Sequence, residues 1–245
     1  VGNDGVIFAS RLASAGDVTV ASQGAVTLGG PVDAVRDFAV AGNGVTLGAA
    51  GVAVTQRAGR AVTLDSGTGD LAGPSGLRLA ATDATGAVSL ASGGPGGISF
   101  AADTAIAAGT LGADGAYSGS LRLQTGGAAA LGTVDTGNLT LVGGSLAGSV
   151  TAERVFARDP LAIRSTAGSL GLGQVRSFAG GVSLIADAGA VLVDAVRAGG
   201  DVTVSAGTTV AGRATSAAAD GRLLVGQGRT GLLADPAGAR IAVTT

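Results

Sequence analysis

Five residue types are missing from this 245-residue chain: cysteine, histidine, methionine, lysine and tryptophan. Without histidine and cysteine a Ser-His-Asp or Cys-His catalytic centre cannot form, and the commonest ligands of transition metals are absent. The lack of cysteine also excludes disulfide bonds. We therefore expect no catalytic centre of these kinds, no metal ion and no other cofactor.

The charge of the chain is low and is not concentrated in a basic region. All 15 basic residues are arginine, and Glu153 is the single glutamate among 17 acidic residues, for a net charge of −2. A nucleic-acid-binding surface requires clustered basic side chains. We therefore exclude nucleic acid from the expected partners.

The absence of methionine bears on the extent of the chain, because a complete primary translation product begins with that residue. We expect residues 1–245 to form a single domain that is a processed or excised piece of a longer repeat protein. Residues 1–30 also lack a basic start followed by an apolar stretch, so no signal peptide is visible. Any export signal is expected outside this piece.

Glycine, in contrast, is abundant: 46 of the 245 residues are glycine, while 46% are hydrophobic and the mean hydropathy is +0.50. High glycine content is typical of disordered or fibrous chains, but this apolar content argues against disorder. Frequent tight turns explain the composition, because glycine adopts positive φ without steric cost. An ordered fold with many turns is favoured over a silk-like low-complexity chain, which would lack a regular register.

A short apolar-polar-apolar phrase recurs along the chain, usually bounded by glycine or another turn residue. Successive side chains of a strand point to opposite faces, so the valines and leucines face one side and the residue between them faces the other. Such recurrence is typical of stacked repeats, which bury their apolar rows collectively. The phrase occurs at Asp17–Val20, Ala25–Leu28, Gly44–Leu47, Ala61–Leu64, Asn138–Leu141, Gly181–Leu184 and Asp201–Val204.

The repeats fall into register with a period of roughly 20 residues, which is typical of one supersecondary unit per repeat. A second apolar series follows about eight to ten residues later and indicates at least two strands per coil. The sequence therefore predicts an all-β fold, a parallel β-helix or β-solenoid, with about a dozen coils. The predicted inner column is Val18, Phe38, Val62, Leu77, Ile98, Leu121, Leu139, Leu161, Val182, Val202, Leu223 and Ile241, and the second series is Val26, Val45, Val88, Ile106, Leu146, Leu170, Val191, Val210 and Leu232.

Three segments interrupt this register and are the candidate binding regions. Ala49–Arg60 and Thr110–Ser120 are long intervals, and insertions in a solenoid map to loops that often form the binding face. Glu153–Pro160 is the most charged run of the chain. A plain solvated corner is the alternative interpretation of each segment. The candidate ligand contacts are Arg57, Asp114, Tyr117, Arg154 and Arg158, of which Tyr117 is the only aromatic residue with a hydroxyl.

Two further motifs are weak. Gly93–Gly97 begins like a calcium-binding nonapeptide repeat, but no aspartate follows in the required place and no second copy exists, so no calcium site is expected. The lone sequon at Asn138 permits glycosylation in an exported protein. A single match to so short a motif is close to chance, and Asn138 is equally well explained as a turn residue.

The enzyme hypothesis that survives is a carbohydrate-active β-helix, because glycosidases use pairs of carboxylates beside the substrate. The nearest acidic pairs are Asp33 with Asp37 and Asp65 with Asp70. Most aspartates stand singly at turns, where aspartate is common for structural reasons. We therefore expect that the protein is not an enzyme.

Phrases such as Gly16–Ser22 and Gly200–Gly207, repeated about every 20 residues, resemble the shaft of filamentous-haemagglutinin-like exoproteins of the two-partner secretion family. The likeness covers most of residues 17–245. It implies a right-handed parallel β-helix that a dedicated partner exports through the outer membrane of a Gram-negative bacterium. The family's N-terminal secretion domain carries Asn-Pro-rich motifs, and no Asn-Pro occurs here, so the chain resembles the shaft alone. The passenger domains of autotransporters are stacked β-solenoids of the same kind, and the sequence does not separate the two export routes.

The resemblance implies a structural stalk of a secreted or surface-displayed bacterial adhesin, which presents binding or effector regions away from the cell. The implied partners are the outer-membrane transporter of the parent protein and a host-cell or bacterial surface receptor or glycan. No polar cap is evident at either end of the sequence, so neighbouring coils or end-to-end self-association are also expected. The alternatives are a carbohydrate-binding or carbohydrate-cleaving β-helix protein and a self-assembling surface filament subunit.

Overall fold

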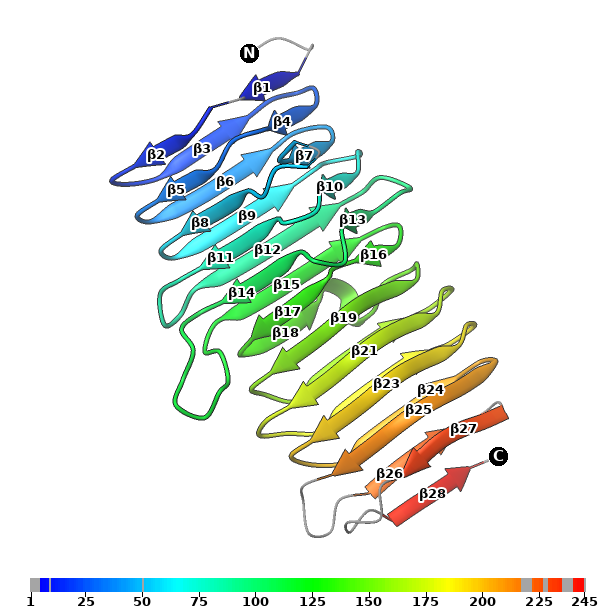
Figure 1. The fold of residues 1–245 in the computed structure, drawn as a ribbon. Coiled ribbons are helices and arrows are strands. Elements are labelled where there is room, and N and C mark those ends of the chain that lie inside the picture. Colours follow the sequence, from blue (N-terminus) through cyan, green and yellow to red (C-terminus); the bar gives the residue numbers. More distant parts are fainter. Residues whose placement is uncertain are drawn as a thin grey trace.

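The computed structural model describes residues 5–8, 10–49, 51–216, 222–226, 229–234 and 240–244. Over these residues the fold is all-β, and parallel strands of successive coils lie on one another in a long stack (Figure 1). The one helical segment described is the short 3₁₀ turn η1 (Val142–Gly144). None of the described helical structure has the length and apolarity needed to span a membrane. The predicted β-solenoid is confirmed.

Each coil of the N-terminal half contains three strands. Two of them belong to a large sheet of 17 strands, and the third belongs to a second sheet of six strands. The strands are β1 (Val6–Phe8), β2 (Leu12–Ser14), β3 (Val18–Ala21), β4 (Val26–Leu28), β5 (Val32–Ala34), β6 (Asp37–Ala41), β7 (Val45–Leu47), β8 (Thr55–Ala58), β9 (Ala61–Asp65), β10 (Leu71–Gly73), β11 (Arg78–Ala81), β12 (Ala87–Ser92), β13 (Ile98–Phe100), β14 (Ala105–Ala108), β15 (Ser120–Thr125), β16 (Ala129–Ala130), β17 (Thr133–Thr136) and β18 (Asn138–Leu141).

From β19 onward each coil contains two longer strands. The start of β19 pairs with β16 and its end pairs with β17, so one bent strand continues two rows of the large sheet. The opposite face is a third sheet of five strands. The strands are β19 (Val150–Ala157), β20 (Leu161–Ser165), β21 (Leu170–Ser177), β22 (Val182–Ala186), β23 (Val191–Ala198), β24 (Val202–Ala206), β25 (Thr209–Ser216), β26 (Arg222–Gly226), β27 (Arg229–Ala234) and β28 (Arg240–Thr244).

The alternating phrase explains the core. In β9 the side chains of Val62 and Leu64 are buried and Thr63 between them is exposed, and the same pattern repeats on the next coil with Val88 and Leu90. Stacking places these apolar side chains in columns that form one continuous core cluster. Burying a side chain of this size contributes about 1.5–3 kcal/mol, which no single coil can obtain alone.

The predicted column is correct at most coils and wrong at two. The column of the second sheet continues from Val62 to Val88 and then to Leu121, over intervals of 26 and 33 residues. Leu77 instead lies in the turn before β11, and Ile98 begins β13 of the large sheet. The error arose because all three strands of a coil carry the same apolar alternation, so spacing alone does not assign a strand to its face.

The first long interval, residues 49–60, was predicted to be a surface loop, and this is wrong for part of it. Residues 55–58 form β8 of the large sheet. The side chain of Gln56 lies at an inner position of this strand and is fully buried. Its Nε2 donates a hydrogen bond to the carbonyl oxygen of Gly30 at 3.1 Å, while its Oε1 has no hydrogen-bond partner among the described residues. Gln56 is therefore a polar residue in an otherwise apolar column of Val32, Leu79, Ile106 and Val134.

The seam between β18 and β20 is the structural discontinuity of the solenoid. The described strands of the second face form two separate sheets, because β18 ends at Leu141 and η1 carries the chain out of the ladder. Leu146 then bonds to the backbone of β20 through the Arg164 carbonyl and the Thr166 amide. A small apolar cavity lies in the core at this level, lined by residues that include Leu139, Leu141 and Ile163.

Replacing Gln56 by leucine is expected to raise the free energy of unfolding by about 1 kcal/mol. The substitution removes the amide oxygen that has no partner, which offsets the loss of the bond to the buried Gly30 carbonyl, and the added apolar contact in the column supplies the net gain. Urea-induced unfolding measures the change. Gln124→Leu on the exposed face of β15 is the control and is expected to stay within about 0.5 kcal/mol of the parent. A loss of stability in Gln56→Leu would show that the bond to Gly30 outweighs the unpaired oxygen.

The seam is expected to open before the rest of the stack. The amides of β18 and β20 have a strand ladder on one side only, so local opening disrupts fewer hydrogen bonds there than in β22, which pairs on both sides. Hydrogen exchange followed by mass spectrometry checks this. Peptides from β18 and β20 are expected to exchange faster than the peptide from β22; equal protection would contradict a weak seam.

Candidate functional site

The large sheet forms a concave elbow in the middle of the solenoid. Between β13 and β14 the connection is the four-residue segment 101–104, and between β16 and β17 it is only Leu131 and Gly132. In β19 the two strands merge, and the outward-facing neighbours Glu153 and Arg154 mark a bulge where the strand bends. Because the connections shorten in this way, no loop covers the inside of the bend.

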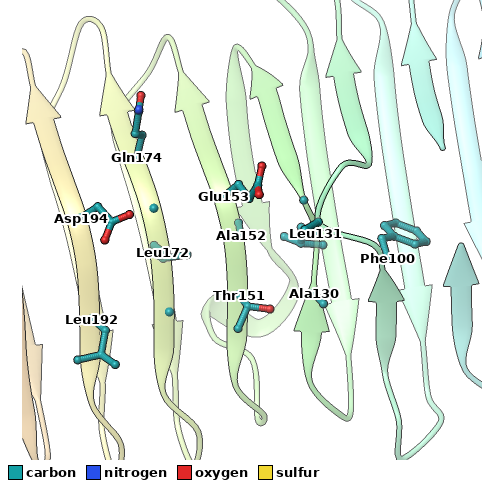
Figure 2. A pocket seen from close by; sticks show the side chains of 14 residues that line it. Phe100, Ala130, Leu131, Thr151, Ala152, Glu153, Leu172, Gln174, Leu192 and Asp194 are labelled. Atoms are coloured by element: carbon teal, nitrogen blue, oxygen red, sulfur yellow. The ribbon is translucent and has the colours of Figure 1, made fainter. Parts of the chain in front are cut away.

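A groove of about 660 Å³ occupies this elbow and extends from β13 to β23 (Figure 2). Two rows of side chains flank it. One row is Ala130, Thr151, Gly171 and Leu192, which are register partners on successive coils. The other row carries Glu153, Gly173 and Asp194, with Gln174 beside it. Between the rows, the side chains of Leu131, Ala152 and Leu172 turn into the core and are 2%, 8% and 3% exposed, so the strand backbone forms the floor of the groove. Phe100, which is 4% exposed, lies at one end.

Glu153 and Asp194 are the only charged side chains that line this groove, and both are exposed. They lie two coils apart, which separates their backbones by about 10 Å. Gly173 lies on the coil between them, where a Cβ would approach the carbonyl oxygen of Glu153 to 2.2 Å. Only glycine fits there, and the space between the two carboxylates consequently stays open.

Gly171 differs from Gly173, because an added Cβ would meet the Thr151 methyl at an ordinary contact distance of 3.5 Å. A side chain at position 171 is therefore compatible with the backbone. It would project into the groove between Thr151 and Leu192, which is 49% exposed. No local pattern in the sequence predicts this groove: Glu153 stands out only as part of a charged run, and Gln174 and Asp194 do not stand out at all.

The loop at residues 109–119 is an insertion, as predicted, and it projects from the side of the stack between β14 and β15 (Figure 1). It closes on itself through an antiparallel bridge between Leu111 and Tyr117. Asp114 accepts a hydrogen bond from the Ala116 amide at 3.1 Å and forms a 3.3 Å ion pair with Arg158. The Ala116 amide and the Arg158 guanidinium hold the pKa of Asp114 below its usual range. The structure thus joins two of the predicted regions, which are 44 residues apart at this contact.

Arg154 takes part in a ladder of arginine and aromatic side chains beside this loop. It forms an ion pair with Asp135 and lies 5.0 Å above the ring centroid of Phe156. On the next coil Arg176 lies 3.9 Å above Phe178. The two phenylalanine rings meet edge to face at 6.3 Å. The two arginine–phenylalanine pairs each lie within one coil, so the contacts that join neighbouring coils are the phenylalanine pair, worth about 0.5–1.5 kcal/mol, and the ion pair of Arg154 with Asp135.

Arg57 lies apart from these regions, on β8. It pairs with Asp33 at 3.1 Å, and Asp33 pairs in turn with Arg11 at 3.3 Å. Asp37 lies on a different strand, β6, and pairs with Arg60. Each carboxylate is therefore engaged by arginine, and the structure does not bring Asp33 and Asp37 together as an acid-base pair. We assign Arg57 to an ion-pair row between coils.

The second acidic pair supports turns. Asp65 accepts a hydrogen bond from the Gly67 amide at 2.9 Å, and Asp70 accepts bonds from the amides of Gly96 and Gly97 on the following coil at 2.9 and 3.1 Å. These contacts are the turn role expected of aspartate. Among the residues that the structure describes, no cluster of three or more acidic residues could hold a metal ion.

Asn138 lies at the start of β18 and not in a turn. Its Oδ1 accepts a hydrogen bond from the Thr140 hydroxyl at 2.9 Å. Glycosylation at this residue stays a prediction. Tyr117 is half-buried in the inserted loop, and its role in ligand contact likewise stays a prediction.

Comparison with known proteins finds no matching family model, no matching curated protein and no matching solved structure.

Stability is expected to fall as the pH decreases through about 4, the ordinary pKa range of aspartate. The Ser75 hydroxyl and the Gly76 amide lower the pKa of Asp103, as the contacts above lower that of Asp114. A carboxylate whose pKa is lower in the folded state adds stability at pH values above its unfolded pKa, and this stability is lost as the folded pKa is passed. Thermal unfolding at a series of pH values measures the loss.

The matched variants for this measurement are Asp103→Asn and Asp83→Asn. The first removes a carboxylate that bonds to Ser75 and Gly76, so its melting temperature is expected to be lower at neutral pH and to depend less on pH between about 5 and 2. The second is the control for loss of a surface charge, because Asp83 is exposed and its carboxylate forms no hydrogen bond among the described residues. Identical pH profiles for Asp103→Asn and the parent would contradict the role of Asp103.

Proposed function

We propose that this chain is part of the shaft of a secreted or surface-displayed bacterial exoprotein, which holds binding or effector regions away from the cell. The observation that carries the proposal is the large sheet, whose 17 strands form two ladders that merge at β19 and continue to β27. The described coils form a rod of roughly 50 Å at the strand spacing of about 4.8 Å. A longer parent chain would lengthen this rod in proportion to its number of coils.

The surface of the rod supports the same proposal. Outside the elbow groove, the arginines of the predicted sites form ion pairs with aspartates: Arg57 with Asp33, Arg154 with Asp135 and Arg158 with Asp114. These pairs connect different coils and so reinforce the stack. Nearest-neighbour stacking also allows folding to propagate from coil to coil, which suits a chain that folds as it leaves the cell through an outer-membrane transporter.

The shaft proposal is tested by where the protein lies on the bacterium that encodes it. Antibodies raised against the purified 245-residue chain are applied with gold label to intact and to lysed cells, and an antibody to a cytosolic protein is the control. Labelling of intact cells at a distance from the outer membrane is expected, together with its removal by external protease. Label that appears only after lysis would contradict the proposal.

A carbohydrate-binding function is the second candidate, and the elbow groove is the observation that favours it. Its open shape and mixed polar and apolar lining are typical of sites for extended ligands. The two functions are compatible, because the groove lies on the side of the rod and leaves the ladder intact.

A further inference from the structure

We propose that the elbow groove binds an uncharged oligosaccharide, which lies along the axis of the solenoid. In this site Glu153, Gln174 and Asp194 exchange hydrogen bonds with sugar hydroxyls, while the exposed side chain of Leu192 contacts the face of a sugar ring. This assignment rests on the second candidate function above, for which it names the class of ligand, and it does not depend on the shaft function.

The length of the groove favours a chain-like ligand over a compact one. Its lining residues come from β13, β16, β19, β21 and β23, which span about 19 Å at the strand spacing. The groove is open along one side, and its floor is formed by successive coils of the same sheet. A ligand with its own repeat can thus contact equivalent positions on consecutive coils.

The polar side chains match a ligand that is rich in hydroxyl groups. A carboxylate accepts hydrogen bonds at two oxygens, the Gln174 amide both donates and accepts, and the Thr151 hydroxyl does the same. Hydrogen bonds to the carboxylates are the stronger ones, because the acceptor is ionised. The carboxylates of Glu153 and Asp194 lie on the same row two coils apart, so they accept hydrogen bonds from a ligand at two points along its length.

The charge of the lining selects against acidic ligands. Two carboxylates face the groove, and no arginine is among the residues that line it. A uronic acid, a sulfated sugar or a phosphate group would place a third negative charge beside them without a compensating cation. The ligand is therefore an uncharged glycan and not an anionic one.

The spacing of the two carboxylates argues against a retaining glycosidase. The paired carboxyl groups of a retaining glycosidase lie about 5–5.5 Å apart, whereas here the backbones of Glu153 and Asp194 are about 10 Å apart with an open glycine position between them. Phe100 is the one aromatic side chain among the lining residues, and because it is only 4% exposed the groove offers no aromatic face for stacking on sugar rings. We assign binding of modest affinity, which repeated display on a surface would raise by avidity.

The experiment uses the intact 245-residue chain and a panel of immobilised glycans that contains neutral glucans, mannans, xylans and galactans beside uronate-containing and sulfated polysaccharides. Oligosaccharides of the best binder are then titrated by isothermal calorimetry. Binding to at least one neutral glycan is expected, with a dissociation constant on the order of 0.1–1 mM. Binding to acidic glycans alone, or to none of the panel, would overturn the proposal.

Variants of the lining locate the site. Gly171→Leu fills the groove at a position where a Cβ is tolerated, and it is expected to weaken binding at least about tenfold. Glu153→Gln and Asp194→Asn remove ionised acceptors and are each expected to weaken binding about fivefold. Gly126→Leu is the matched control, since an added Cβ there also meets only an ordinary contact, 3.7 Å, outside the groove.

Circular dichroism verifies that each variant keeps its β structure. Folded Gly171→Leu that binds as tightly as the parent would overturn the assignment of the site, and so would stronger binding by Glu153→Gln or Asp194→Asn. Surface labelling of cells is independent of these results. Failure of glycan binding therefore leaves the shaft proposal intact, and internal location of the protein leaves glycan binding intact.

Discussion

The ladder of backbone hydrogen bonds between coils is the constraint on which the rest of the structure depends. Every peptide group in a strand needs a partner, and here that partner is the same strand of the coil above or below. The ladder fixes the spacing of the coils at about 4.8 Å and brings backbones close at the corners. Gly173 shows the consequence, because the carbonyl oxygen of Glu153 on the preceding coil leaves no room for a side chain.

Stacking turns sequence-distant residues into neighbours, and this explains where the charges pair. Asp33 bridges Arg11 and Arg57, which belong to the coils on either side of it. Each of these exposed pairs is worth at most about 1 kcal/mol, so the ion pairs follow the register and do not create it. The core columns supply the main stabilisation, and the seam beside β18 is weak because both the ladder and the core contacts are interrupted there.

The sequence predicted the fold because strand alternation and turn glycines are local signals. It misplaced Leu77 and Ile98 because the length of a coil varies while the alternation of its strands does not. It placed Gln56 in a loop because a polar side chain gives no local sign of burial. The elbow groove could not be predicted, since Glu153 and Asp194 come together only after coils of unequal length are stacked in the correct register.

The position of the groove follows from how a solenoid can acquire a ligand site without losing its ladder. Outward side chains of a flat sheet form a shallow surface, and an inserted loop such as 109–119 must be held by contacts such as Asp114 with Arg158. A bend avoids both difficulties, because it makes a concave surface from strands that the ladder already fixes. Glycines at 171 and 173 then keep that surface open. The same regular stacking that makes a rod therefore repeats the bend on successive coils and turns it into a groove along the axis.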